Sequence, residues 1–202
     1  MSILTYDEAG NVDRLELLPT RARVAFALLV ASRLLPSYRR FHERTGRGDA
    51  SALEGIADRL WLDLAGEPMS DDEVQAAAEQ CLELVPSEED GVDAETQPHA
   101  EDAAVALRAR QDGDAHNAAW AAQRAYETLD HHAASLLGKK AFGPDAETKI
   151  LSHPLVQAEL ARQNRDLVDL TRLDATGELE AQLPTLRDRA QKEADAFFAE
   201  QT

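Results

Sequence analysis

Apolar side chains recur through most of the chain at intervals of three and four residues, the period of an α-helix. The clearest case begins near Thr20, where Val24, Leu28 and Ala31 follow helical spacing and the residues between them are also largely apolar. A helix that is apolar nearly all round is typical of the middle of a bundle. The pattern therefore predicts a central first helix.

Proline, glycine and capping residues mark where the helices should begin and end. Pro36 should end or kink the first helix, because proline lacks an N–H and clashes with the preceding turn, and a short piece over 37–44 continues at an angle. Asp49 or Ser51, with Glu54 as its capping-box partner, should begin the second helix. Later helices are expected from Ser70 to Pro86, over 99–111, from Asp114 to about residue 137, from Pro154 to Gly177, and from Pro184 onward.

These elements predict an all-α protein, an irregular bundle of about seven helices. The length of 202 residues suits one domain over 1–202, with a possible subdivision at the loop 138–144. Cys81 is the only cysteine, which excludes a disulfide within the chain and a cysteine-based metal site. Residues 1–10 lack the pattern of a signal peptide, and no apolar run approaches the ~20 residues that span a bilayer. We therefore expect a reducing cytoplasm.

Charge is distributed unevenly along the chain. The formal net charge is −17, and the segment from Leu60 to Leu107 contains fourteen acidic residues and no Lys or Arg. This balance argues against nucleic acid and against anionic membranes as partners, because both need clustered cations. A basic protein remains a plausible partner. A contribution to solubility alone is the other interpretation.

The sequence contains no recognisable catalytic motif. It lacks a nucleophile elbow and both glycine-rich phosphate loops, and Cys81 lies on an apolar helical stripe. Glu127 and His131 share a helix face, but the sequence contains none of the Glu-x-x-His pairs that bundle metal sites repeat on separate helices. We expect no catalytic residue, no metal and no cofactor, and a protein that is not an enzyme is the favoured interpretation.

Arginines gather around the first helix, at positions 33, 39, 40, 44 and 47. We expect several of them to pair with acids of the second and third helices, because acids are in excess. Binding of an anionic ligand is the alternative.

Part of the first half resembles a known family. The carrying pattern is Arg33-Leu34-Leu35-Pro36-x-Tyr38-x-x-Phe41, then Thr45-Gly46-x-Gly48-Asp49, with Leu60-Trp61 one helix later. Weaker echoes are Val85-Pro86-Ser87-Glu88-Glu89-Asp90 and Ala100-x-Asp102-Ala103. This pattern is similar to that of the YjaG-like family of uncharacterised bacterial proteins, which carry a domain of unknown function. The resemblance implies an all-helical, acidic, cytoplasmic protein and no activity, cofactor or catalytic residue.

Two functional hypotheses follow. The first is a non-enzymatic interaction protein, in one version an immunity protein that neutralises a basic toxin, with a contact loop formed by Glu88, Glu89, Asp90, Asp93 and Glu95. The second is a helical enzyme or small-ligand-binding protein, with a pocket formed by Arg33, Tyr38, Asp49, Asp102 and His131. The sequence leaves the partner's identity and the oligomeric state open.

Overall fold

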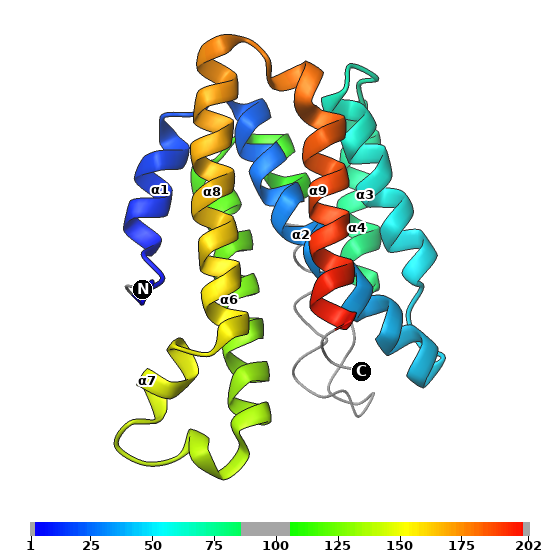
Figure 1. The fold of residues 1–202 in the computed structure, drawn as a ribbon. Coiled ribbons are helices and arrows are strands. Elements are labelled where there is room, and N and C mark those ends of the chain that lie inside the picture. The colour runs from blue at the N-terminus through cyan, green and yellow to red at the C-terminus, as the bar shows by residue number, and fades with distance from the viewer. Residues whose placement is uncertain (1–2, 86–105, 200–202) are drawn as a thin grey trace.

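The computed structural model describes residues 3–85 and 106–199 (Figure 1). Nine helical elements have complete bounds in this portion: α1 (Glu8–Glu16), α2 (Thr20–Thr45), α3 (Ala50–Leu64), α4 (Asp71–Glu83), α6 (Ala115–Leu137), the 3-10 helix η2 (Gly138–Ala141), α7 (Ala146–Leu151), α8 (Pro154–Thr176) and α9 (Leu179–Ala199). Residues 106–112 are also helical, and no strand occurs in the described portion. The prediction of an all-α bundle is confirmed, whereas the predicted count of about seven is too low.

Helix α2 occupies the centre of the bundle. It packs against α3, α6, α8 and α9, and every residue from Val24 to Ala31 is buried (Figure 1). Only a helix without a polar face can take this position, because each of its sides meets another helix. The all-round apolar pattern thus correctly identified the central helix.

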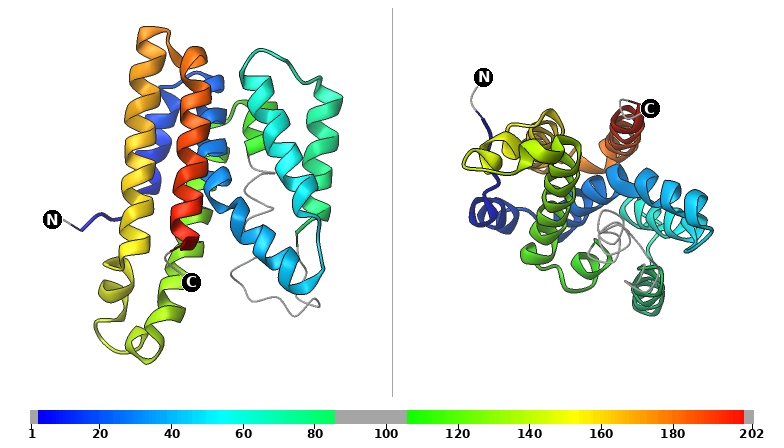
Figure 2. Two further views of the ribbon diagram at one scale, coloured as in Figure 1. Left: turned by 45° about the vertical axis from the view of Figure 1, so that its right-hand side comes forward. Right: turned by 90° about the horizontal axis from the view of Figure 1, so that it is seen from below.

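Pro36 does not end α2, which continues to Thr45. The helix changes direction part-way along its length, and we attribute this bend to Pro36, which can neither donate the expected backbone hydrogen bond nor avoid the preceding turn (Figure 2). Gly46 then ends the helix in a left-handed conformation with φ 69°, and its N–H donates to the carbonyl oxygen of His42 at 2.8 Å.

Local capping chemistry sets most of the other boundaries. Ser70 and Glu73 form the predicted capping box at the start of α4, and the Asp114 carboxylate caps α6. Asp49 caps α3 by accepting from the Ala52 N–H at 2.9 Å. The alternative Ser51–Glu54 capping box is wrong, because the Ser51 hydroxyl donates to Asp49 and Glu54 instead pairs with an arginine.

Three features of the helices differ from expectation. Helix α1 was not predicted, since Leu15 is its only fully buried apolar residue and its periodicity is weak. Helix α9 begins at Leu179 and runs through Pro184, where the sequence suggested a start. The expected loop 138–144 contains η2. The predicted start of α8 at Pro154 and its end before Gly177 are both confirmed.

The main apolar core includes residues from both sides of the 138–144 loop, such as Leu28 of α2, Leu167 of α8 and Leu186 of α9. The subdivision at this loop stays a prediction. None of the helices in the described portion has the length and apolar character needed to cross a membrane.

Candidate functional site

Arg33 of α2 is the first of the predicted pocket residues and lies inside the bundle. Its side chain is only 4% exposed and pairs with acids of α8 and α9, two helices that pack against α2. The guanidinium donates two hydrogen bonds to Glu159 of α8, from Nε to Oε2 at 3.0 Å and from Nη2 to Oε1 at 2.7 Å. Its Nη1 donates to Oδ2 of Asp166, about two helical turns further along the same face of α8, at 2.7 Å. Arg33 is therefore clamped between two carboxylates of one helix.

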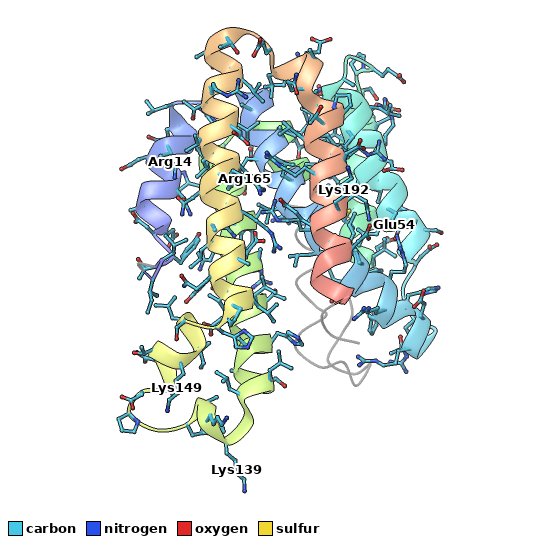
Figure 3. All side chains as sticks on the ribbon, viewed as in Figure 1. Arg14, Glu54, Lys139, Lys149, Arg165 and Lys192 are labelled. Carbon is cyan, nitrogen blue, oxygen red and sulfur yellow. The ribbon has the colours of Figure 1, made fainter. Side chains whose placement is uncertain are left out.

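Asp166 is the most enclosed member of this group, with a side-chain exposure of 0%. Besides the bond from Arg33, its Oδ1 accepts hydrogen bonds from Nη2 of Arg189 at 2.8 Å and from Nη2 of Arg165 at 3.0 Å. Three guanidinium groups from three helices thus meet at one carboxylate. Arg165 is labelled on α8 in Figure 3.

Two further acids complete what we call the buried arginine cluster: Arg33, Glu159, Arg165, Asp166, Asp169, Arg189 and Glu193. Asp169 accepts from Nη1 of Arg189 at 2.6 Å, and Glu193 pairs with Nη1 of Arg165 at 2.6 Å. Each charge in the cluster has a partner of opposite sign.

The electrostatics of Arg33 favour its charged form. Burial alone lowers the pKa of its guanidinium, but the negative charges and hydrogen bonds of Glu159 and Asp166 outweigh that effect, so the pKa is raised. Burial also lowers the pKa of Arg165, but the hydrogen bonds that Arg165 donates to Glu193 and Asp166, together with their negative charges, outweigh this effect and raise the pKa. A permanently charged, fully paired group of this kind fixes the relative positions of helices and is poorly suited to exchanging protons.

Tyr38 and Asp49, the next two predicted pocket residues, lie close together at the other end of α2. The Tyr38 hydroxyl is buried and donates to the carbonyl oxygen of Leu84 at 2.8 Å. Burial raises its pKa, with a smaller contribution from the Asp49 charge. The backbone N–H of Ala52 lowers the pKa of Asp49, as expected for a helix cap. Gly48 allows this corner to form, because a Cβ there would lie 2.2 Å from the Tyr38 hydroxyl oxygen.

The remaining predicted pocket residues are not brought to this corner. His131 is exposed on α6, where its Nδ1 lies 2.9 Å from the carbonyl oxygen of Glu127, and Asp102 lies outside the described residues. Arg33 is buried against α8 and α9, away from Asp49. Within the described residues, no group of three or more His, Cys, Asp or Glu side chains is arranged to hold a metal ion.

The arginine-pairing prediction has a mixed outcome. Arg39 pairs with Glu54 of α3, with Nη2 and Oε1 2.7 Å apart, as expected. Arg33 also pairs internally, but with acids of α8, and the expectation that its partners come from the next two helices is wrong for this residue. Arg40, Arg44 and Arg47 have polar or charged contacts as well.

Helix α4 lies at the edge of the bundle beside α3 (Figure 2), and its exposed surface is rich in acidic side chains. The exposed acids of this helix are Asp71, Asp72, Glu73, Glu79 and Glu83. The helix contains no Lys, Arg or His. We call this surface the α4 acidic face. The predicted contact acids Glu88, Glu89, Asp90, Asp93 and Glu95 all lie outside the described residues.

Members of the α4 acidic face differ in how firmly they are held. Glu73 forms the capping box with Ser70, and its Oε1 lies 3.8 Å from Nη2 of Arg59. Glu79 accepts a hydrogen bond from Gln75 on the same helix. Asp72 and Glu83 make no hydrogen bond or ion pair with any part of the chain that the structure describes. Leu82 adds an apolar contact point, since 47% of it is exposed. The face therefore combines available carboxylates with one exposed apolar side chain.

Sequence reasoning missed the carboxylates of the buried arginine cluster. Glu159 and Asp166 are seven residues apart, with Gln163 between them, and this spacing places all three on one face of α8. All three are buried, although they are polar. A strip of polar residues beside the apolar stripe of an otherwise regular amphipathic helix was the signal that could have revealed them.

Comparisons with known proteins give a family and a fold. A family model described as "Protein of unknown function (DUF416)" matches residues 10–194. The chain is similar to the crystal structure of a DUF416 family protein from Shewanella baltica OS155, with 18% sequence identity and a TM-score of 0.74, over 88% of this chain and 93% of that chain. A likeness at this identity bears on the fold alone. No curated protein matches the chain.

Proposed function

Since the chain belongs to the DUF416 family, whose description assigns no activity, we propose a function from its own surface. The protein is a non-enzymatic interaction protein, and the α4 acidic face binds a basic protein partner. The observation that carries this proposal is the gathering of five exposed acids on a helix without a single cation.

The rest of the charge distribution supports this assignment. Several acids elsewhere are engaged within the fold: Asp63 with Arg110 at 2.7 Å, Glu54 with Arg39, and Asp166 in the buried arginine cluster. Those carboxylates stabilise the protein itself, so they are less available to a partner. Asp72 and Glu83 have no such internal role among the described residues.

Charge complementarity gives this surface a physical mechanism. Carboxylates on α4 would meet Lys and Arg side chains of the partner and steer its approach, which can raise association rates toward ~10⁸ M⁻¹s⁻¹ at low salt. The exposed Leu82 would supply apolar contact area on the same helix. The interaction should weaken as the salt concentration rises.

A narrower version of the proposal specifies the partner. In this version the protein is an immunity-type protein, and the partner is a basic toxin such as a nuclease whose phosphate-binding cations the carboxylates occupy. The acids Glu88, Glu89, Asp90, Asp93 and Glu95 extend the contact in this version. The YjaG-like naming of the family likewise stays a prediction.

The second hypothesis, a helical enzyme or ligand-binding protein, was tied to a pocket of Arg33, Tyr38, Asp49, Asp102 and His131. The described members of that set occupy three separate places, so their arrangement does not favour it. An acidity that serves solubility alone remains the simpler alternative to the interaction, and the experiment below separates the two.

The test compares two charge variants of the purified chain, each immobilised and exposed to lysate of its source cells. The first neutralises the α4 acidic face with Asp72→Asn, Glu79→Gln and Glu83→Gln. The matched control removes the same charge from exposed acids elsewhere with Asp13→Asn, Glu16→Gln and Asp174→Asn.

Proteins retained by the wild-type chain are eluted with a salt gradient and identified by mass spectrometry. A basic protein that is retained by the wild type and the control variant but lost from the α4 variant supports the proposal. Equal loss from both variants would indicate a general charge effect, and retention by both would rule out this face. Retention of no basic protein by the wild type would favour a role of the acidity in solubility alone.

A further inference from the structure

A groove lies on the outer side of the contact between α8 and α9, next to the buried arginine cluster. It has a volume of about 430 Å³ and is lined by Arg162 of α8 and by Thr185, Asp188, Arg189, Lys192 and Glu193 of α9. Figure 3 labels Lys192 on α9. Three of the six lining side chains are cationic, in a protein whose acids outnumber its Lys and Arg by 38 to 21.

Arg162 is the unusual member of this groove. Its side chain is only 20% exposed, yet its guanidinium makes no hydrogen bond in the described part of the protein. The nearest carboxylate oxygens, from Glu159 and Glu193, are both 3.9 Å away, beyond hydrogen-bond distance. A guanidinium offers five donors, and a largely buried one normally has acceptors for several of them. Arg162 therefore lies within ion-pair distance of two carboxylates but donates a hydrogen bond to neither, which leaves its donors available at the groove.

Lys192 offers a second cation to the same groove. Its ammonium group is exposed and forms no ion pair with the residues that the structure describes. Arg189 adds positive charge to the wall, although Asp166 and Asp169 bind its two terminal nitrogens. In a chain with excess acid, a guanidinium without a hydrogen-bond acceptor beside an ammonium without an ion pair among the described residues points to an acceptor that comes from outside.

The acids in the groove do not fill this role. Glu193 already bonds to Arg165 at 2.6 Å and lies 3.9 Å from Arg33, so its negative charge is shared inside the cluster. Asp188 is exposed and has no partner among the described residues, and its charge opposes an incoming anion. Removing the Asp188 charge should therefore strengthen the binding of an anion.

We propose that the α8–α9 groove binds a small molecule through an oxyanion, a phosphate or a carboxylate, which Arg162 and Lys192 hold together. The guanidinium fork of Arg162 matches two oxygens of such a group, and the Lys192 ammonium supplies a point charge. The Thr185 hydroxyl lines the same groove and can donate a third hydrogen bond. The buried arginine cluster fixes α8 against α9, so the two cations are positioned before the ligand arrives.

The experiment is a titration of the isotope-labelled full chain, followed by amide NMR shifts, with inorganic phosphate in one arm and succinate in the other. Sodium chloride at matched ionic strength is the reference for both arms. We expect saturable shifts that centre on the α8–α9 groove. Tighter binding of phosphate than of succinate would indicate a ligand that carries a phosphate. Tighter binding of succinate would indicate a ligand that carries a carboxylate. Shifts in neither arm beyond those of sodium chloride would overturn the proposal.

Four single variants, each compared with wild type, test the site itself. Arg162→Gln and Lys192→Gln should each weaken binding about tenfold, the usual effect of losing one charge-assisted hydrogen bond. Arg172→Gln, also on α8 and 58% exposed, removes the same charge outside the groove and should change affinity less than twofold. Asp188→Asn should strengthen binding severalfold, a gain that misfolding cannot mimic. Equal effects of Arg162→Gln and Arg172→Gln, or no gain with Asp188→Asn, would refute the site.

Discussion

Replacement of Arg33 by methionine should destabilise the protein severely, because it leaves buried negative charge without its partner. Methionine retains much of the apolar stem but cannot donate to Glu159, which is 2% exposed, or to Asp166. Asp166 keeps Arg165 and Arg189, whereas Glu159 keeps only the Gln163 amide at 3.1 Å and Arg162 at 3.9 Å. Removing one partner of a buried ion pair costs about 3–5 kcal/mol.

This cost can be measured by urea unfolding followed by circular dichroism. With a urea dependence of about 2 kcal/mol per molar, the unfolding midpoint of Arg33→Met should fall by about 2 M. Arg39→Met is the matched control, because Arg39 lies on the same helix and also has a carboxylate at 2.7 Å, but is 47% exposed. It should cost only about 0.2–1 kcal/mol.

A double variant shows whether the unpaired charge causes the loss. The double variant Arg33→Met with Glu159→Met leaves no carboxylate without a partner beside position 33. It should therefore regain more than half of the stability that Arg33→Met alone loses. If Arg33→Met costs no more than Arg39→Met, the cluster is not a buried charge network of the kind described. If the two single costs simply add in the double variant, lost packing rather than unpaired charge explains the effect.

Three further predictions concern other sites. Burial raises the pKa of the Cys81 thiol to about 12, so a thiol reagent at about pH 8 should label it only after denaturation. Gly48→Ala should lower the free energy of unfolding by more than Gly46→Ala, for which we expect a loss of about 1–2 kcal/mol. Both glycines have φ near 70°, but only at Gly48 would the new Cβ collide with Tyr38. The urea unfolding midpoints of the two variants measure the difference. The hydrogen bond from the Ala52 N–H lowers the pKa of Asp49 below its ordinary value of 3.8. The cap therefore contributes its full stability at a pH above 3.8, and this stability is lost as the pH falls through the pKa of Asp49 in the folded protein. The stability gap between wild type and Asp49→Ala should therefore close in acid, and a gap that widens would contradict the assignment.

Features set by neighbouring residues were predictable from the sequence. The Ser70–Glu73 capping box, the Asp114 cap and the Pro154 start each depend on residues within four positions, and each was placed correctly. The central position of α2 followed from its own composition. Helix α1 was missed because Leu15 is its only fully buried apolar residue, and it is held by distant contacts such as the stacking of Tyr6 on Tyr126 at 5.1 Å.

The partners of Arg33 were not predictable in this way. Glu159 and Asp166 lie 126 and 133 residues further along the chain, and the sequence offers 38 acids from which to choose. The nearest acids in sequence were a reasonable expectation for exposed arginines, and Arg39 with Glu54 meets it. For a buried arginine, the helix that covers it decides the partner, and only the packing of α2 against α8 reveals which helix that is.

The buried arginine cluster also links stability to the proposed anion site. Glu159 and Glu193 are satisfied by Arg33 and Arg165, and this is what leaves Arg162 without a hydrogen bond at the groove. In Arg33→Met, Glu159 would need a new cation, and Arg162 at 3.9 Å is the nearest one available. The recruited guanidinium would then be less free to bind an oxyanion, so Arg33→Met should weaken phosphate binding although Arg33 does not line the groove. An unchanged affinity in a folded Arg33→Met protein would mean that Arg162 is held in place by something other than this competition between carboxylates.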